Sequence, residues 1–240
     1  MASSEVLVSL HDVEKDYRAL RPLRVRHLEL RQQESIALTG LDRAAAEVLV
    51  NLITAATLPD AGIVNIFGAP TGDIVDPDSW LRTLDHFGIL SERVVLLDEL
   101  TVEQNLTLPL TLEIEAIPHA IRQRVGELAD EVGIAREQLN RPVAALSPGL
   151  RLRVRLAKAL VLNPRVLLAE HPNAMLPPED ISRFAADLSR LVSSRRLAAL
   201  VITTDNAFAR AVSQRVLALR PATGALTPTG WRRWFGQACF

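Results

Sequence analysis

Short apolar runs alternate with amphipathic segments along most of this chain. In the first half, the runs at residues 35–39 and 62–68 flank residues 44–58, which have one apolar face. An apolar run of about four to eight residues bounded by turn residues indicates a strand, and an apolar stripe with a helical period indicates a helix. The start of the chain is therefore predicted to contain a β-α-β unit.

The second half repeats this alternation. Strands are predicted at residues 165–169, 199–203 and 215–219, and helices at residues 178–194 and 207–213. The strand segments are almost continuously apolar, which is typical of strands buried on both faces. Because helices separate them in the sequence, we expect a mainly parallel sheet that is covered by helices on both sides.

The region from residue 100 to residue 146 lacks strand patterns and is predicted to be helical. Its clearest helix spans residues 119–132, with Pro118 as a start signal and Gly133 as a stop signal. Apolar residues recur on one face of this helix at spacings of three and four: Ile121, Val125, Leu128 and Val132. We interpret the region as a helical subdomain inserted into the α/β core.

The predicted organisation is one core that the helical subdomain interrupts. Residues 1–99 form the first part of the core, residues 100–146 the helical subdomain, and residues 147–229 the second part of the core. Residues 230–240 form a tail with two of the chain's three tryptophans and two of its six phenylalanines. Such a density of aromatic side chains predicts a segment that docks on the domain or on a partner.

The composition narrows the function classes. The 240 residues are 48% hydrophobic and 23% charged, with a formal net charge of -1. This chain lacks the basic surface that holds nucleic acid, so nucleic acid is not an expected partner. No stretch reaches the roughly 18 apolar residues of a membrane span, the first residues lack a leader pattern, and Cys239 is the only cysteine. We expect a cytoplasmic protein without a direct membrane span.

Three stretches of sequence carry a resemblance to a known family. Residues 146–160, LSPGLRLRVRLAKAL, resemble the signature motif and helix of ATP-binding cassette (ABC) ATPases. Residues 163–172, NPRVLLAEHP, resemble their Walker B strand at the family's spacing, and residues 101–110, TVEQNLTLPL, are similar to the stretch after the Q-loop. The resemblance covers essentially the whole chain. It implies an α/β, P-loop NTPase-like (RecA-like) core with N-terminal antiparallel strands and an inserted α-helical subdomain.

The segment at the place of the phosphate-binding loop departs from this family. A phosphate cradle needs glycines, a lysine for the phosphate charge and a Ser or Thr for Mg²⁺, whereas residues 40–47 read GLDRAAAE. Only Gly40 remains, because Ala46 stands at the lysine position and Glu47 at the Ser or Thr position. Asp42 adds a carboxylate, and each like-charge contact at about 4 Å costs on the order of 4 kcal/mol. An ordinary strand-turn-helix segment fits these residues better than a phosphate site.

The other catalytic positions implied by the resemblance also differ from the residues that the family has there. Glu170 replaces the Mg²⁺-linked aspartate, and His171 replaces the glutamate that polarises water, for which a mostly neutral imidazole is a poor substitute. Pro177 stands at the D-loop aspartate, Thr204 at the H-switch histidine, and Glu92 at the Q-loop glutamine, with a shift of one residue left open. His171 also fits a hydrogen-bonded residue at the rim of a strand. The pattern predicts a degenerate catalytic site and no metal site.

Two features of the family pattern are better kept. Tyr17 occupies the place of the aromatic residue that stacks on adenine, and an amphipathic surface or core position explains it equally well. Ser147 is a natural N-cap with Pro148 at the first helical position, and a helix N-terminus favours phosphate. In the family, the residues matching Ser147 and Gly149 complete the nucleotide site of an opposing subunit. A plain helix cap is the alternative for Ser147.

The resemblance leads to three hypotheses for function. The first is a catalytically inactive pseudo-ATPase that pairs with an active ABC ATPase subunit as a heterodimer and couples to a transmembrane permease at the cytoplasmic face of the inner membrane. No cofactor is then expected on its own site, and ATP with Mg²⁺ is expected only at a composite site with the partner. The second is an active ATPase with divergent motifs, and the third is a scaffold outside transport. A similarity to lipoprotein-releasing, macrolide-export and lipid-trafficking ATPases favours a lipid or lipoprotein cargo.

Overall fold

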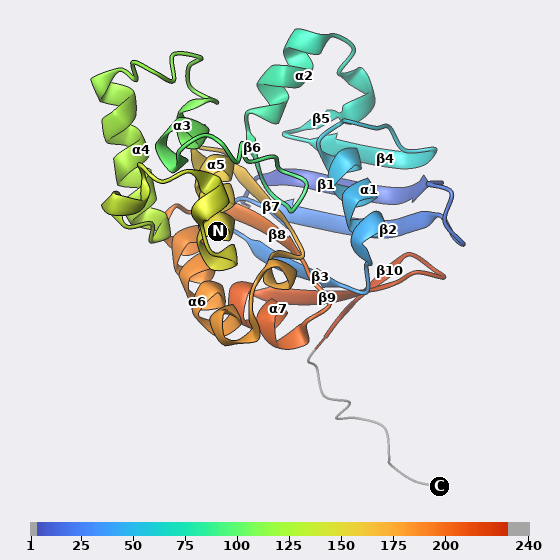
Figure 1. Ribbon diagram of the computed structural model, residues 1–240. Coiled ribbons are helices and arrows are strands. Elements are labelled where there is room, and N and C mark those ends of the chain that lie inside the picture. Colours follow the sequence, from blue (N-terminus) through green and yellow to red (C-terminus); the bar gives the residue numbers. More distant parts are fainter. Residues whose placement is uncertain (1–3, 230–240) are drawn as a thin grey trace, which may run out of the picture.

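The computed structural model describes residues 4–229, which form two β-sheets and the helices that cover them (Figure 1). The larger sheet has six strands in the order β10-β9-β3-β8-β7-β6. Its neighbouring strands pair in parallel except for β9 and β10, which are antiparallel. The strands are β3 (Ser35–Thr39), β6 (Phe87–Leu90), β7 (Val166–Glu170), β8 (Ala198–Ile202), β9 (Arg215–Arg220) and β10 (Ala225–Pro228).

The smaller sheet is antiparallel and has four strands in the order β2-β1-β4-β5. These strands are β1 (Val6–Lys15), β2 (Leu23–Arg31), β4 (Ala61–Ile66) and β5 (Ala69–Pro70). In β2, buried and exposed residues alternate over Leu23, Arg24 and Val25, as expected for a strand with one buried face. This sheet therefore covers the core and leaves its other face to solvent.

The described helices follow the amphipathic segments of the sequence. The α-helices are α1 (Arg43–Ile53), α2 (Pro77–Leu84), α3 (Val102–Thr107), α4 (His119–Val132), α5 (Pro148–Leu160), α6 (Pro178–Ser194) and α7 (Asn206–Val212). The short 3-10 helices are η1 (Thr71–Asp73), η2 (Arg136–Gln138), η3 (Val143–Ala145) and η4 (Pro172–Met175).

The six-stranded sheet buries side chains on both of its faces. Successive residues of a strand point to opposite faces, and in β8 this alternation divides the strand between two apolar clusters. Ala199 and Val201 join the cluster made with α3 to α7, whereas Leu200 and Ile202 join the cluster made with α1 and the small sheet. The near-continuous apolar strands seen in the sequence follow from this double burial.

Helix α1 lies between the two sheets. It contacts β2 and β4 of the smaller sheet and β7 of the larger one. Its inward side chains include Ala46, Leu49 and Ile53, which are fully buried. The start of α1 is therefore held by packing on both sides.

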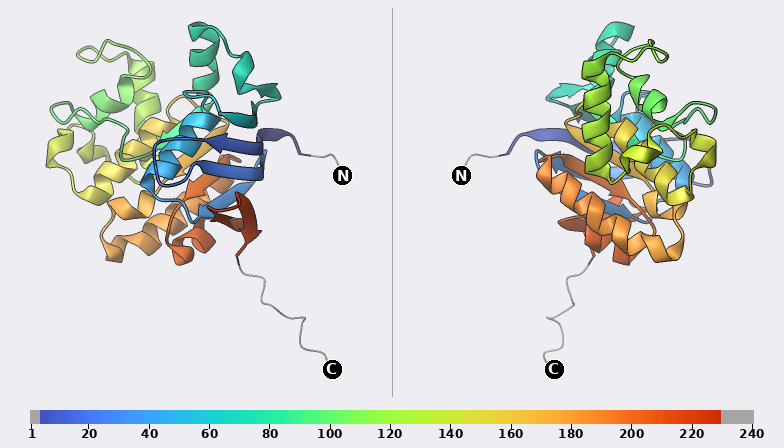
Figure 2. Two further views of the ribbon diagram at one scale, coloured as in Figure 1. Left: turned by 90° about the vertical axis from the view of Figure 1, so that its right-hand side faces the viewer. Right: turned by 60° about the vertical axis from the view of Figure 1, so that its left-hand side comes forward.

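The region from residue 100 to residue 146 contains α3 and α4, which lie at the side of the molecule away from β1 and β2 (Figures 1 and 2). The predicted helix 119–132 is confirmed, and Gly133 ends it in the left-handed conformation with φ 77°. Helix α3 begins at a capping box, in which Thr101 and Gln104 each bond the other's backbone N–H. The region thus contains two α-helices and the short 3-10 helices η2 and η3, and its interpretation as an inserted subdomain stays a prediction.

The predicted fold class is also confirmed, with two local corrections. The segment predicted at residues 62–68 is β4, which pairs with β1 in the antiparallel sheet and is not part of a parallel β-α-β unit. The first half of β4 is exposed, whereas an inner parallel strand needs two buried faces. Helix α1 ends at Ile53 and not at residue 58, because Ala55 adopts a positive φ of 55°.

The structure leaves two predictions untested, the docking of the tail and the division of the core into two parts. The aromatic tail at residues 230–240 lies beyond the described residues. The division into core parts 1–99 and 147–229 stays a prediction. Within residues 4–229, no helix is long and apolar enough to cross a membrane.

We expect the packing of β6 on α5 to be sensitive to one methyl group. A Cβ added at Gly88 would lie 2.4 Å from the carbonyl oxygen of Ala159, so strand and helix must separate. Gly88→Ala should therefore lower the free energy of unfolding by about 1–3 kcal/mol. The matched control is Gly72→Ala, where a Cβ meets nothing within 4 Å and the change should stay within about 0.5 kcal/mol. Equal urea unfolding midpoints for both variants would contradict this packing.

Candidate functional site

The carboxyl ends of the parallel strands meet at one edge of the six-stranded sheet. Gly40 follows β3, Ser91 follows β6 and His171 follows β7. In α/β proteins this edge is where ligands bind. A pocket of about 270 Å³ lies here, and seven residues line it: Arg43, Glu47, Ser91, Glu92, Arg93, Glu170 and His171. The structure thus brings together four residues that the sequence singled out, Glu47, Glu92, Glu170 and His171.

The N-terminus of α1 is closed by a side chain of its own turn. Asp42 is the N-cap, and its Oδ1 accepts a hydrogen bond of 2.8 Å from the backbone N–H of Ala45. The helix dipole favours an anion at this end, and the Asp42 carboxylate already supplies one. Ala46, one residue further, has no exposed surface and belongs to the core. One backbone donor at the positive end of α1 is therefore taken by Asp42.

Gly40 is required by the backbone. Its φ is 87°, a conformation that favours glycine, and an added Cβ would lie 2.7 Å from the carbonyl oxygen of Leu219. The turn from β3 into α1 thus passes close to β9. This contact accounts for the glycine without a ligand.

Glu170, at the end of β7, is buried and engaged by two side chains of the loop after β6. Its Oε2 accepts hydrogen bonds from Ser91 Oγ at 2.9 Å and from Arg93 Nε at 3.1 Å. Arg93 Nη2 lies 2.5 Å from Glu170 Oε1, so the pair is bidentate, and Arg93 Nη1 lies 3.3 Å from Glu47 Oε1. The hydrogen bonds with Glu170 raise the pKa of Arg93 above its usual value. One guanidinium therefore joins the two carboxylates.

Glu92 does not take part in this cluster. It forms an exposed ion pair with Arg43 at 3.0 Å, while its neighbours Ser91 and Arg93 reach Glu170. Arg43 was not predicted as a site residue, and Ser91 and Arg93 are the neighbours of Glu92 that a shift of one residue in the Q-loop alignment would select. The available signal was Arg93, a basic residue between Glu92 and the apolar run of residues 94–97.

His171 has an unusual backbone conformation and an unsatisfied side chain. Its φ is 44°, a region that non-glycine residues rarely adopt. The backbone N–H donates to the carbonyl of Ile202 at 2.8 Å, but among residues 4–229 the buried Nε2 has no hydrogen-bond partner. The backbone of His171 is thus hydrogen-bonded, whereas its ring Nε2 has no hydrogen-bond partner among the described residues. The role of His171 at the rim of the strand stays a prediction.

Thr204 and Pro177 lie outside this pocket. Thr204 is exposed, while the preceding Thr203 is buried and donates to Asn173 Oδ1 at 2.8 Å. Pro177 is the N-cap residue of α6. Neither residue lines the pocket around Glu170.

Tyr17 shares a second pocket with the turn before α1. This pocket has a volume of about 500 Å³, and Tyr17, Gly40, Asp42 and Ala45 line it together with residues 19–24, Leu219 and Pro221. Burial raises the pKa of the Tyr17 hydroxyl, and the negative charge of Asp42 raises it further. The resemblance assigns Tyr17 to the adenine and the turn before α1 to the phosphates of one nucleotide. In the structure, Tyr17 and this turn are neighbours.

Ser147 and Gly149 lie in a third pocket, at the start of α5. Ser147 is the N-cap, as predicted, and its Oγ accepts from the N–H of Leu150 at 3.4 Å. The pocket has a volume of about 340 Å³ and is also lined by Arg153, Asp180 and Arg183, among others. Neither Ser147 nor Gly149 lines the pocket around Glu170. Within one chain, the two sets of residues are not part of the same site.

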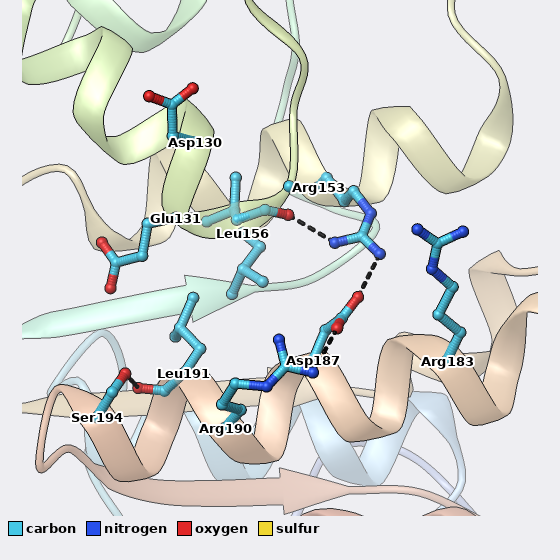
Figure 3. A pocket seen from close by; sticks show the side chains of 11 residues that line it. Asp130, Glu131, Arg153, Leu156, Arg183, Asp187, Arg190, Leu191 and Ser194 are labelled. Carbon is cyan, nitrogen blue, oxygen red and sulfur yellow. Dashed lines mark hydrogen bonds and ion pairs between the residues drawn. The ribbon is translucent and has the colours of Figure 1, made fainter.

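Ion pairs hold α5 in place beside this pocket, in a hollow between α4, α5 and α6 (Figure 3). Arg153 Nη1 donates to the carbonyl of Val132 at 2.6 Å, and its Nη2 lies 2.6 Å from Asp187 Oδ2. Arg190 approaches the other oxygen of Asp187 at 3.1 Å. Burial raises the pKa of Asp187, but hydrogen bonds and charge from both arginines lower it more, and the net shift is downward. Arg153 thus ties the three helices together.

The mixed, mostly parallel sheet, the N-terminal antiparallel sheet and the site at the carboxyl edge define an α/β P-loop fold of the ABC type. The sequence model described as ABC transporter matches residues 23–174. The chain belongs to the ABC transporter family.

Two curated relatives illustrate the similarity. The lipoprotein-releasing system ATP-binding protein LolD of Paramagnetospirillum magneticum (strain ATCC 700264 / AMB-1) is 34% identical over 186 residues, which cover 77% of this chain and 80% of that protein. The methionine import ATP-binding protein MetN of Brucella abortus (strain 2308) is 29% identical over 219 residues, or 91% of this chain. The aligned part covers only 58% of that MetN.

Two solved structures share the fold. One is cbiO1 from Clostridium perfringens, described as part of the ABC transporter complex cbiONQ, with a TM-score of 0.79, 19% identity and coverage of 93% of this chain and 87% of that one. The other is the dimeric structure of MJ0796, a bacterial ABC transporter cassette, with a TM-score of 0.76, 24% identity and coverage of 90% and 96%. At these identities the likeness shows the fold alone.

We expect the Arg153–Asp187 pair to stabilise the chain in a pH-dependent way. Asp187→Asn should lower the free energy of unfolding at neutral pH by about 1–2 kcal/mol, the lower part of the range for hydrogen bonds to a charged group. The folded-state pKa of Asp187 is lowered, so this contribution is complete above the unfolded pKa of about 3.9 and is lost as the pH falls through the folded value. Urea unfolding of both proteins from pH 7 to pH 3 measures the difference.

Asp130→Asn is the control, because Asp130 forms a bidentate pair with Arg136 that is more exposed to solvent than the Arg153–Asp187 pair. Its effect on stability should be smaller. A stability loss for Asp187→Asn that does not shrink at low pH would contradict the proposed charge effect.

Proposed function

We propose that the chain is an ABC transporter subunit that couples to a permease and pairs with a second cassette, while its own site does not hold Mg-ATP. The observation that carries the proposal is the closed N-terminus of α1, where the Asp42 carboxylate accepts the N–H of Ala45. A bound phosphate needs such backbone donors and the positive helix end. The Asp42 carboxylate would compete with a phosphate for the N–H of Ala45 and for the positive end of the helix.

The charges around the turn support the same proposal. Ala46 is a buried methyl group at the position of the phosphate-binding lysine, and Glu47 supplies a carboxylate at the position of the Mg²⁺-binding hydroxyl. Each carboxylate at about 4 Å from a phosphate would cost on the order of 4 kcal/mol at an effective dielectric constant near 20. The nearby cation Arg93 is engaged by Glu170 and Glu47. These residues do not fit Mg-ATP.

An active ATPase with divergent motifs is the second candidate function. It is favoured by the similarity to proteins named ATP-binding, over 77% and 91% of this chain. In that case an arginine beside the pocket, Arg43 or Arg93, would have to meet the phosphates in place of the lysine. Direct binding of nucleotide to the purified chain separates the two candidates.

The partners and cargo are also part of the proposal. The two solved structures are described as a dimeric cassette and as part of a transporter complex, and we propose a second cassette as partner by this analogy of fold alone. Membership in the ABC transporter family supports a permease as the other partner. We place the chain at the cytoplasmic face of the inner membrane, held there by the permease. The relative named lipoprotein-releasing supports a lipid or lipoprotein cargo, whereas the relative named for methionine import supports a different one. Recovery of a permease with the chain from its native membrane would argue against a scaffold outside transport.

Isothermal titration of the purified chain with Mg-ATP is expected to give no binding heat up to millimolar nucleotide. Its melting temperature should stay constant, because a ligand at 100 times its dissociation constant would add about 2.7 kcal/mol of stability. Ala46→Lys should not restore binding, since Asp42 and Glu47 remain. The LolD relative, titrated in the same buffer, is the positive control. Micromolar binding to the wild-type chain would favour the active ATPase.

The role of Ser147 is tested in the assembled transporter. If α5 faces the nucleotide of a partner cassette, Ser147→Arg should lower the partner's ATPase rate by at least tenfold, because the added side chain fills the phosphate position. In the isolated chain the same change should remove only an N-cap worth about 1 kcal/mol. Unchanged ATPase activity of a fully assembled complex would show that Ser147 is only a helix cap.

A further inference from the structure

The loop between β6 and α3, residues 91–101, is fixed by side chains from several elements. We name it the β6–α3 loop. On one side, Arg155 and Lys158 of α5 donate to the carbonyls of Val94 and Val95 at 3.3 and 2.9 Å. At the far end, the buried Asn105 of α3 bonds both the N–H and the carbonyl of Leu97. The loop is therefore held along its length by polar contacts to α5 and α3.

At its start, Arg93 attaches the β6–α3 loop to the six-stranded sheet. The Arg93 guanidinium makes a bidentate pair with Glu170 of β7 and a further contact with Glu47 of α1. Glu170 is only 7% exposed, whereas the Arg93 side chain is 40% exposed. A buried carboxylate requires a partner, since its desolvation is otherwise uncompensated. Arg93 is the cation that meets this requirement.

The carboxylates of Glu170 and Glu47 approach the same point, and a cation between them compensates their charges. Glu170 and Glu47 come from different elements, and one guanidinium lies between them with contacts of 2.5 and 3.3 Å. Ser91 Oγ adds an oxygen beside Glu170, and His171 lines the same pocket with a buried Nε2 that has no partner among residues 4–229. Carboxylate and hydroxyl oxygens are ligands that a divalent cation accepts. Among residues 4–229, however, no group of three or more His, Cys, Asp or Glu side chains could hold a metal ion, and the cation at this position is the guanidinium of Arg93.

We propose that Arg93 is a specificity-determining residue, whose guanidinium takes the place between Glu170 and Glu47 that a divalent cation would otherwise occupy and thereby fixes the β6–α3 loop without any ligand. The proposal rests on the proposed function, because it explains why this chain does without Mg-ATP. Because the Arg93 guanidinium is attached to the chain, it is present at a high effective concentration beside the two carboxylates. A hydrated divalent ion has to displace it and shed water as well.

The consequence concerns the exposed part of the β6–α3 loop. Val95 is 66% exposed and Leu97 is 43% exposed, so the loop presents two apolar side chains to solvent. Arg93 holds the start of this segment through its contacts with Glu170 and Glu47.

The test uses Arg93→Gln, which removes the charge and the bidentate geometry. Arg136→Gln is the matched control, since Arg136 also forms a bidentate pair, with Asp130 on the surface. Two quantities are measured on the full chain: hydrogen exchange of the loop amides at residues 92–97, and binding of Mn²⁺ alone by electron paramagnetic resonance. The double variant Arg93→Gln/Glu170→Gln, which buries no unpaired charge, is measured in case the single variant does not fold.

The wild-type chain and Arg136→Gln should bind no Mn²⁺ at millimolar concentration and should exchange the loop amides equally slowly. In Arg93→Gln these amides should exchange at least tenfold faster, and Mn²⁺ should bind and restore part of the protection. The double variant should show the fast exchange without Mn²⁺ binding, because one of the two carboxylates is gone. These results together would support Arg93 as the internal cation.

Two results would overturn the inference. One is binding of Mn²⁺ by the wild-type chain with faster loop exchange, which would mean that the ion displaces Arg93. The other is loop exchange in Arg93→Gln and in the double variant equal to that of Arg136→Gln, which would mean that the contacts from α5 and α3 suffice. Either result could occur while Mg-ATP still fails to bind, so the failure of this inference is distinguishable from a failure of the proposed function.

Discussion

The burial of the six-stranded sheet on both faces is the constraint on which the rest of the structure depends. Apolar strands such as β7 and β8 need a cover on each side, which α1 with the small sheet provides on one face and α3 to α7 on the other. With both faces closed, only the strand ends remain for polar chemistry. The polar residues of the candidate site therefore collect at the carboxyl edge.

This arrangement separates the stability of the fold from the chemistry of the site. The apolar contacts of Leu49, Leu168 and Leu200 do not depend on the residues beyond the strand ends. Residues at the edge are free to change as long as the turn geometry survives, which Gly40 secures through its positive φ. Asp42 and Ala46 both stabilise the start of α1, one as a cap and the other by packing. A strand-turn-helix unit of the family can thus be stable without phosphate.

The edge nevertheless has an electrostatic requirement of its own. Glu170 continues a buried strand, so its charge is removed from water by the same packing that stabilises the sheet. Arg93 and Ser91 meet that charge from the β6–α3 loop, and Glu47 shares the guanidinium. A loop that elsewhere exposes Val95 and Leu97 is in this way bound to the core. Site and loop are coupled because a buried charge needs a partner.

The sequence by itself determined the fold class, the helix at residues 119–132 and the cap at Ser147, because apolar periodicity and capping are local properties of the chain. The sequence also singled out Glu47, Glu170 and His171, because they stand at the positions of the catalytic motifs of ABC ATPases. Only the tertiary structure decided that β4 joins the antiparallel sheet and that Arg93, not Glu92, meets Glu170. Strand pairing and ion pairs join residues far apart in sequence, so their geometry depends on how whole elements pack and cannot be read from spacing.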